Sequence, residues 1–271
     1  MTEMIIVSLT SYGQRIANVP LVLDTIFTQT VKPDSIVLNL AYDEPVLPNV
    51  LEYLKQNDVE VNRVPDTKVY KKLIPTLIKY PDACIINIDD DFLYPNTMVS
   101  DFITIHEQYP NNPISGNRVV YGGMQCHCGC ASLTKASFFG DYLSKVDDEI
   151  IRHCPSSDLL YTYFATKSGH PYLQTEYEYF HNLLSCNDNP EDGYSRQVIG
   201  NQGIKDTYNY LTRHFGPIGD VLSLYVQDPH VAKVIRGIQQ DEIWEIESSI
   251  RSSRKYRLGK FLLSPFSWLK K

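Results

Sequence analysis

The chain has 271 residues, of which 43% are hydrophobic and 11% aromatic, so it is long and apolar enough to bury one sizeable core. This composition excludes a disordered or fibrous protein. The formal net charge is −7, but residues 251–271 carry seven basic side chains and no acidic ones, which leaves −14 on residues 1–250 and argues against general nucleic-acid binding.

The N-terminal segment does not have the pattern of a secretory signal. Its apolar run is about five residues long and no basic region precedes it. No stretch approaches the roughly 18 apolar residues that a membrane-spanning helix needs. We therefore expect a cytoplasmic protein, in which the six cysteines are mostly reduced thiols.

Strand and helix patterns alternate from the N-terminus to about residue 90. Short apolar runs predict buried strands at residues 4–9, 35–40, 59–64 and 83–88. Apolar residues at helical spacing predict helices at residues 19–26, 51–56 and 71–80. This alternation is typical of a doubly wound α/β fold, with a mainly parallel sheet and helices on both faces. Ligands of such folds bind beyond the carboxyl ends of the strands.

The alternation weakens after residue 110. The remaining patterns predict strands at 118–121 and 129–133, a helix at 157–167, a long loop at 187–203, and helices at 204–215 and 231–253. We expect one catalytic-type domain over residues 1–226, followed by a C-terminal helix and a basic aromatic tail over residues 227–271.

Three consecutive carboxylates, Asp89, Asp90 and Asp91, follow the fourth predicted strand. Like charges this close raise one another's pKa and destabilise the fold unless something positive lies beside them. A divalent cation with oxygen ligands, holding a diphosphate, would meet that need. The alternative is a solvated acidic turn that caps a helix beginning near Pro95, and the position after the fourth strand of an α/β pattern favours the metal.

Four segments resemble a family of bacterial GT-A glycosyltransferases found in polysaccharide gene clusters, a family 2-like group. The segments are VSLTSYGQRI (7–16), LDTIFTQTVKPDSIVLNL (23–40), YKKLIPTL (70–77) and IINIDDDFLYP (85–95). They cover about the first 95 residues in the order and spacing of the family. The resemblance implies a GT-A fold, a nucleotide-sugar donor, and Mn²⁺ or Mg²⁺ as the cofactor.

Carried over residue by residue, the resemblance also implies roles for individual side chains. Asp91 would ligate the metal, and Asp89 would ligate it or face the ribose or the metal's water. The remaining residues would bind the nucleotide-sugar: Thr10, Ser11, Tyr12, Arg15, Asp43, Lys71, Lys72 and Asp90. The two lysines open a predicted helix and would offset phosphate charge, although a solvated helix face is the alternative. Asp43 could equally be a turn residue in AYDEP.

The segment PSSDLL (155–160) resembles the second acidic motif of the family, where a carboxylate opens a helix on the acceptor side. An inverting transferase needs a general base to take the proton from the acceptor hydroxyl, and Asp158 is our candidate. The family often has two adjacent acids here, whereas this chain has Ser157 in the first place. The alternative is an acidic residue in the first turn of a capped helix.

Cys126, Cys128 and Cys130 alternate with other residues, and His127 and the pair His153-Cys154 lie in the same part of the chain. This spacing differs from that of a zinc knuckle, in which two residues separate the cysteines. Alternation would instead place all three thiols on one face of a strand, as pocket-lining or core side chains. His214 is expected to be a surface histidine, with a metal or diphosphate contact as the alternative.

The C-terminal segment mixes arginine and lysine with Leu, Phe and Trp. Such a segment can lie at the inner face of the cell membrane, with its cations against anionic lipid, and a lipid-linked acceptor would be found there. The alternative for residues 251–271 is packing onto the body of the protein or onto a second subunit of a homodimer.

Three functions are compatible with these features. The first is a metal-dependent, inverting glycosyltransferase that moves a sugar from a nucleotide-sugar, UDP-linked by the resemblance, to an acceptor glycan or lipid-linked glycan. The second is a nucleotidyltransferase of sugar-nucleotide metabolism, but SLTSYGQR is a poor version of the glycine- and basic-rich phosphate loop of that class. The third is a non-catalytic scaffold of a glycan assembly complex, against which the intact aspartates argue.

Overall fold

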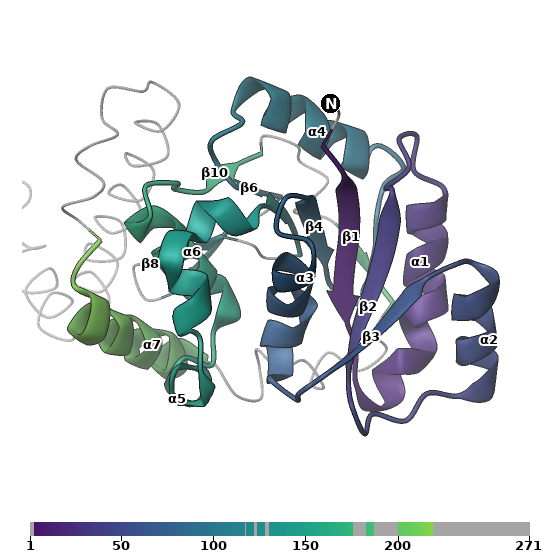
Figure 1. Ribbon diagram of the computed structural model, residues 1–271, viewed down its shortest axis with the longest axis horizontal. Helices are drawn as coiled ribbons and strands as arrows, with labels where there is room; N and C mark the ends of the chain where they lie inside the picture. Colours follow the sequence, from purple (N-terminus) through teal and green to yellow (C-terminus); the bar gives the residue numbers. More distant parts are fainter. Residues whose placement is uncertain are drawn as a thin grey trace, which may run out of the picture.

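The computed structural model describes residues 3–116, 118–121, 124–127, 130–175, 183–186 and 200–218. Within these residues a mixed, mainly parallel sheet of seven strands forms the centre of the fold (Figure 1). In spatial order the strands are β10 (Leu173–Gln174), β6 (Ile114–Ser115), β9 (Ala131–Thr134), β4 (Cys84–Ile88), β1 (Ile5–Thr10), β2 (Ser35–Ala41) and β3 (Glu60–Val64). Only β9 runs antiparallel to its neighbours among these strands.

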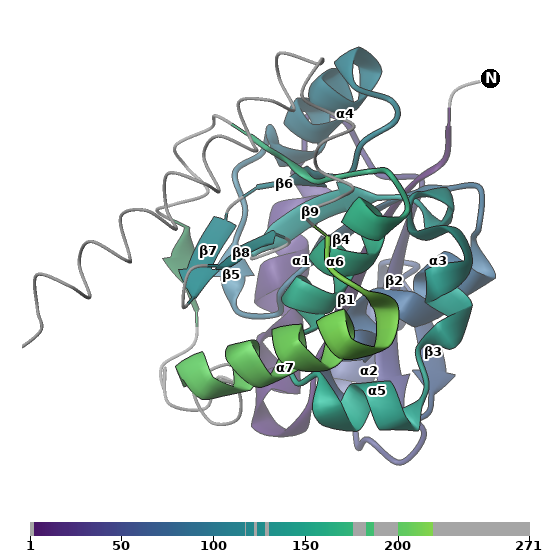
Figure 2. The same ribbon diagram turned by 90° about the vertical axis from the view of Figure 1, so that its left-hand side faces the viewer.

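Helices cover both faces of this sheet (Figures 1 and 2). On one face lie α1 (Val19–Phe27), α2 (Pro48–Gln56) and α4 (Met98–Gln108). On the other face lie the 3₁₀ helices η2 (Lys68–Lys72) and η3 (Ala136–Lys145), together with α3 (Ile74–Lys79), α5 (Asp148–His153), α6 (Ser157–Lys167) and α7 (Gly200–Phe215). None of the helices in the described part of the chain is long and apolar enough to cross a membrane.

Alternation of apolar side chains along the strands divides the core into two clusters. In β1, Val7 and Leu9 pack with α1, α2 and α4, whereas Ile6 packs with α3 and α6. Successive side chains of a strand point to opposite faces, so a strand that is covered on both sides is apolar at nearly every position. The continuous apolar runs of β1, β2 and β4 therefore fit a sheet that is buried between two helical layers.

Three smaller elements complete the described structure. A short 3₁₀ helix, η1 (Gly13–Asn18), connects β1 to α1. Two antiparallel pairs stand apart from the main sheet, β5 (Phe92–Leu93) with β11 (Leu184–Ser185), and β7 (Arg118–Tyr121) with β8 (Met124–His127). The pairing of β5 with β11 brings residues 184–185 beside the chain that leaves the three aspartates.

The α/β class and the order of its first elements are confirmed, and the differences are local. The helix predicted at 71–80 is divided into η2 and α3, because Pro75 has no N–H to continue the helical hydrogen bonds. Helix α2 begins at Pro48, and α7 begins at Gly200, so the end of the loop predicted at 187–203 is helical. The predicted helix at 231–253 and the whole tail segment 227–271 lie outside the described residues.

A buried polar network joins the central strands to η2 and α3. Ser8 Oγ donates a hydrogen bond to the backbone oxygen of Lys72 at 2.6 Å and lies 2.7 Å from Thr76 Oγ1. Asn39 Nδ2 donates to both of these hydroxyl oxygens, at 3.1 and 2.8 Å, and Asn62 Nδ2 donates to Asn39 Oδ1 at 2.8 Å. A satisfied network of this kind fixes one arrangement of its members, so it sets the position of Lys72 over the sheet.

Replacing Thr76 with Val should destabilise the fold by about 1–3 kcal/mol, because the buried side chains of Ser8 and Asn39 would each lose a partner. The matched control is Thr104→Val on α4, where the hydroxyl is exposed and donates to the backbone oxygen of Ser100. That change should stay within about 0.5 kcal/mol. Urea unfolding of both variants measures the difference, and equal losses would contradict a stabilising role for the network.

Candidate active site

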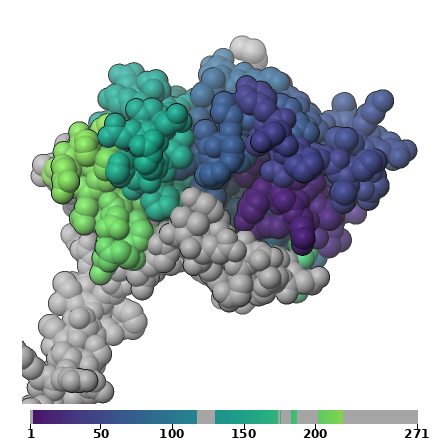
Figure 3. All heavy atoms as spheres, turned by 90° about the horizontal axis from the view of Figure 1, so that it is seen from below, coloured from purple at the N-terminus to yellow at the C-terminus, as the bar shows by residue number. Residues whose placement is uncertain are grey.

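The candidate active site lies at the carboxyl ends of β1 and β4. These strands are parallel neighbours, with Ser8 paired to Asn87, so the residues that follow both strands emerge at the same edge. In Figure 1 the carboxyl end of β1 points down, and Figure 3 therefore faces this edge. The purple N-terminal residues lie next to the blue residues there, with the teal and green residues beyond them. Ligands of doubly wound folds bind at such an edge.

Asp90 is the inward-facing member of the three aspartates. Its carboxylate accepts a hydrogen bond from Ser11 Oγ at 2.5 Å and forms a two-pronged ion pair with Arg15 of η1, whose Nε lies 3.2 Å from Asp90 Oδ2. Burial raises the pKa of Asp90, while Arg15 and Ser11 oppose the rise. Asp90 therefore connects the loop after β4 to the loop after β1.

Asp89 and Asp91 point outward on either side of Asp90, with 29% and 18% of their side chains exposed. Arg15 Nη2 also lies 3.0 Å from Asp91 Oδ2, so a single guanidinium faces two of the three carboxylates. Burial raises the pKa of Asp91 to about 6, the charge of Asp89 adds to the rise, and Arg15 opposes it. Both outward carboxylates present oxygen atoms to solvent at the same edge.

Lys72 connects the aspartates to the candidate base. Its Nζ lies 3.0 Å from Asp89 Oδ1 and 3.7 Å from Asp158 Oδ1, although the three residues come from η2, the end of β4 and the start of α6. The lysine side chain is largely buried, so its charge is poorly screened by water. Among the candidate residues, Asp89, Lys72 and Asp158 thus form one cluster.

Asp158 lies in the first turn of α6, but it does not cap the helix. The N-cap is Ser156, whose Oγ accepts the backbone N–H of Leu159 at 3.3 Å. This leaves the Asp158 carboxylate free to face Lys72. Burial raises the pKa of Asp158, and the charge of Lys72 opposes the rise. A partly buried carboxylate beside a cation is suited to exchanging a proton.

The two predicted lysines have different surroundings. Lys71 forms an ion pair with Asp66, which lies before η2, whereas Lys72 faces the aspartates. Both lysines lie in the last turn of a 3₁₀ helix, where successive residues point in different directions. Of the two, the structure brings only Lys72 into the candidate site.

Thr10 at the end of β1 and Tyr12 just after it are two more of the predicted donor-binding residues. Thr10 Oγ1 donates to the backbone oxygen of Asn39 at 2.7 Å, and the Tyr12 side chain is 40% exposed, with the Arg15 guanidinium 5.6 Å from its ring centre. Gly13 adopts a φ of 55°, in the left-handed region that favours glycine. Its N–H donates to Glu44 Oε1 at 2.8 Å.

Asp43 is an exposed residue of the turn after β2, consistent with either of its predicted roles. Its neighbour Glu44 makes the contact with the loop after β1, and Arg63 of β3 donates to the Glu44 backbone oxygen at 2.7 Å. Glu44 therefore connects the two loops at this edge, a role that the sequence analysis did not predict.

Tyr94 and Cys186, the residue after β11, also hold the aspartate segment. The Tyr94 hydroxyl accepts the backbone N–H of Asp89 at 2.9 Å and donates to the backbone oxygen of Cys130 at 2.7 Å. The Cys186 N–H donates to the backbone oxygen of Asp91 at 2.9 Å. The backbone of the three-residue segment is therefore hydrogen-bonded at both ends, at Asp89 and at Asp91.

The sequence raised the possibility of a zinc site among Cys126, His127, Cys128, Cys130, His153 and Cys154. Among those of them that the structure describes, no such site is seen. Cys130 and Cys154 are buried in the two core clusters, and burial raises the pKa of each thiol to about 12. The side chains of Cys126 and His127, and the whole of Cys128, lie outside the described residues. His214 is exposed on α7 and stacks on Tyr210, as expected of a surface histidine.

The residues that sequence reasoning missed are mainly the supports of the site. Ser8, Asn39 and Thr76 bind no expected ligand, but they place η2 and hence Lys72. A signal for them was present, because Ser8 and Asn39 are polar residues inside otherwise apolar strands. A buried polar residue in a continuous apolar run needs a hydrogen-bond partner, which predicts a network across that face.

No protein-family model matches the chain, and no curated protein resembles it in sequence. Solved structures do resemble it. A mannosyltransferase from Pyrobaculum calidifontis, in complex with GDP-Man and Mn²⁺, matches with a TM-score of 0.57 and 11% identity, over 97% of this chain and 85% of that one. This likeness shows the GT-A type of α/β fold.

Two further solved structures match less well. A cytidylyltransferase from Leptospira borgpetersenii has a TM-score of 0.47 and 15% identity, over 85% of this chain and 96% of that one. TarS residues 1–349 from S. aureus, in complex with UDP, has a TM-score of 0.45 and 10% identity, over 80% of this chain and 72% of that one.

The raised pKa of Asp91 predicts a pH dependence of stability in metal-free protein. Its ordinary value is 3.8 and its folded value is about 6, so the folded state binds more protons between these pH values and stability falls as pH rises through the window. The two-unit difference corresponds to about 3 kcal/mol. Asp91→Asn should reduce this fall in urea unfolding measured with a chelator present, while the raised pKa values of Asp90 and Asp158 account for the fall that remains. Asp43→Asn, in an exposed turn, is the control and should keep the wild-type slope.

Proposed function

We propose that this protein is a metal-dependent glycosyltransferase that moves a sugar from a nucleoside diphosphate sugar to a hydroxyl group of an acceptor glycan or lipid-linked glycan. The observation that carries the proposal is the contact of Lys72 with both Asp89 and Asp158. Through Lys72, the aspartates that suit a metal and a diphosphate lie close to Asp158. The Asp158 carboxylate is suited to deprotonating an acceptor hydroxyl. A single transfer reaction needs both parts within reach of one sugar.

The outward carboxylates of Asp89 and Asp91 fit a hard divalent cation such as Mn²⁺ or Mg²⁺. They offer partly exposed oxygen ligands, while Asp90 is occupied by Ser11 and Arg15 and would act as a support. When bound, the ion would neutralise charge on the diphosphate as it leaves. The similar fold of the mannosyltransferase that holds GDP-Man and Mn²⁺ supports this assignment.

The loops after β1 and β2 are the proposed nucleotide site. The exposed ring of Tyr12 offers a flat apolar surface on which a base can stack, and Asp43 in the neighbouring turn offers a hydrogen-bond acceptor to a base or ribose. Arg15 and Lys72 would bind the diphosphate from opposite sides of the aspartates. The resemblance of the first 95 residues to the bacterial family favours a uridine diphosphate sugar.

Asp158 is the proposed general base of an inverting transfer. As the acceptor oxygen bonds to the anomeric carbon, the carbon–oxygen bond to the diphosphate breaks and Asp158 takes the acceptor proton. Lys72 serves both ends of this reaction, because its ammonium group stabilises the ionised form of Asp158 and lies beside Asp89. The nucleoside diphosphate leaves with the electron pair of the broken bond.

A panel of nucleotides with manganese tests the proposal. A nucleoside diphosphate at one hundred times its dissociation constant should stabilise the protein by about 2.7 kcal/mol in a thermal-shift assay. Slow hydrolysis of the matching nucleotide-sugar should depend on manganese. Release of pyrophosphate from a nucleoside triphosphate would favour a nucleotidyltransferase instead, and binding without any turnover would favour a scaffold. Association of the tail with membranes, and dimerisation, remain predictions from sequence.

The two adjacent lysines provide a matched pair for the diphosphate site. Lys72→Met should weaken binding of the nucleoside diphosphate with manganese by about tenfold to a hundredfold, the usual loss for a hydrogen bond to a charged group. Lys71→Met should leave binding within about twofold, because Lys71 pairs with Asp66 away from the aspartates. Isothermal titration calorimetry gives both constants. Similar losses in the two variants would refute the assignment of Lys72.

Asp158→Asn should still bind the donor but lose transfer by roughly two to four orders of magnitude, the contribution of a positioned general base. Asp91→Asn should instead lose manganese-dependent donor binding while it stays folded. Donor affinity from calorimetry and the single-turnover transfer rate separate the two effects. Transfer within a few-fold of wild type in Asp158→Asn would place the base on another residue.

A further inference from the structure

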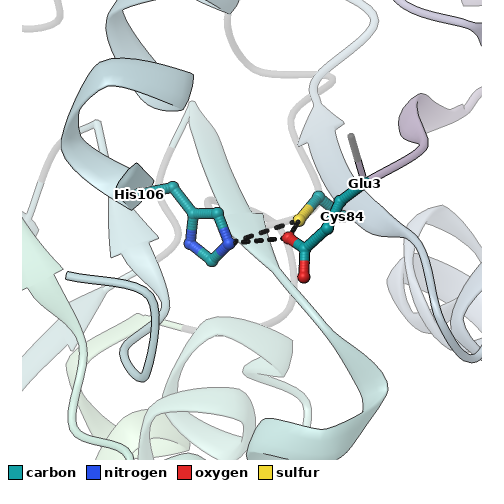
Figure 4. Close-up of side chains that lie close together, drawn as sticks. All are labelled: Glu3, Cys84 and His106. Atoms are coloured by element: carbon teal, nitrogen blue, oxygen red, sulfur yellow. Dashed lines mark hydrogen bonds and ion pairs between the residues drawn. The ribbon is translucent and has the colours of Figure 1, made fainter. Parts of the chain in front are cut away.

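A second cluster of chemically reactive side chains lies at the opposite edge of the sheet. Glu3 precedes β1, Cys84 is the first residue of β4, and His106 lies in the last turn of α4 (Figure 4). Because β1 and β4 are parallel, their amino ends meet at the edge away from Asp89, Asp90 and Asp91. The cluster is therefore separate from the proposed transferase site.

The three side chains converge on one point. Glu3 Oε2 lies 2.9 Å from Cys84 Sγ and 3.0 Å from His106 Nε2, and the sulfur and the nitrogen are 3.5 Å apart. Cys84 and His106 are buried, whereas the Glu3 side chain is 43% exposed. The other Glu3 oxygen, Oε1, is held by Lys135, which orients Oε2 toward the thiol and the imidazole.

These separations are close to those of a tetrahedral zinc ion. Typical zinc bonds of about 2.3 Å to sulfur and about 2.0–2.2 Å to nitrogen or oxygen place the ligand atoms roughly 3.4–3.6 Å apart. The sulfur and nitrogen already have this spacing, at 3.5 Å. Glu3 Oε2 needs to retreat by about half an ångström, and the exposed Glu3 side chain has room to do so.

The protonation of the cluster also suits an exchange of protons for a cation. The Cys84 thiol donates to the carboxylate, which lowers the pKa of Glu3 to about 2, and burial raises the pKa of Cys84 to about 12. A buried thiol in this state is a poor nucleophile, so a catalytic cysteine is not indicated. A metal that replaced the thiol proton would gain a thiolate, an imidazole and a carboxylate as ligands.

We propose that Glu3, Cys84 and His106 form a zinc site with three protein ligands, whose fourth position is filled by water on the side of the exposed Glu3. Binding releases the Cys84 proton to solvent, and the imidazole of His106 would bind the ion through Nε2, with its ring proton on Nδ1. The ion ties the segment before β1 to β4 and α4. Its affinity should rise with pH, because a thiol must lose its proton, while the Lys135 ammonium beside Glu3 moderates the affinity.

Cobalt(II) is the probe, used with the full chain carrying its own N-terminus and no affinity tag. One equivalent of Co²⁺ should produce the charge-transfer absorption of a cobalt–thiolate bond, and zinc should displace it with release of about one proton. Cys84→Ser should abolish the absorption. The matched control is Cys154→Ser, which removes a thiol that is equally buried but packs in the other core cluster.

Two further variants make the result decisive. Glu3→Gln changes an exposed side chain and should weaken zinc binding at least tenfold without unfolding the protein, so it tests the site even where Cys84→Ser does not fold. Asp91→Asn should leave the cobalt–thiolate absorption unchanged, because its carboxylate lies at the opposite edge. The proposal would be overturned if wild-type protein showed no cobalt–thiolate absorption, or if the absorption survived in Cys84→Ser. Unchanged zinc affinity in Glu3→Gln would also overturn it. Any of these results would leave a hydrogen-bonded cluster only.

Discussion

The balance of charge around three adjacent aspartates determines how the rest of this site is arranged. Asp89, Asp90 and Asp91 follow a fully buried strand, where their mutual repulsion is weakly screened. Arg15 faces Asp90 and Asp91 from the loop after β1, and Lys72 faces Asp89 from η2. The cations come from different elements, so the carboxylates can stay together only when those elements are correctly placed.

That requirement explains the polar groups inside an otherwise apolar fold. Lys72 is placed by Ser8, Asn39 and Thr76, which use the face of the sheet that packs under α3 and α6. Burying these groups is favourable only because they bond to one another. The network therefore fixes where the Lys72 ammonium group lies relative to β1 and β2. Through Lys72 it also affects Asp158 on α6.

Much of this arrangement could be predicted from sequence, because it depends on local patterns. The apolar runs identified β1, β2, β3 and β4, and helix α6 has the predicted bounds. Asp89, Lys72 and Asp158 were each predicted as site residues, and the structure places Lys72 beside both carboxylates. The choice between Lys71 and Lys72 could not be made, since it depends on the 3₁₀ geometry of η2, which directs successive side chains differently. The contact of Glu44 with Gly13 joins residues 31 positions apart, which no local pattern shows.

Arg15 occupies the position of an internal counter-ion, and this has a thermodynamic consequence for the proposed reaction. A divalent cation at Asp91 would compete with the guanidinium for the same carboxylate, so metal alone would bind against a built-in competitor. A diphosphate arriving with the metal would give Arg15 a new partner and remove that competition. Metal and donor should therefore strengthen each other's binding by equal factors, as linkage between two ligands requires. The aspartate edge of such a protein binds metal alone less tightly than it binds metal and donor supplied together.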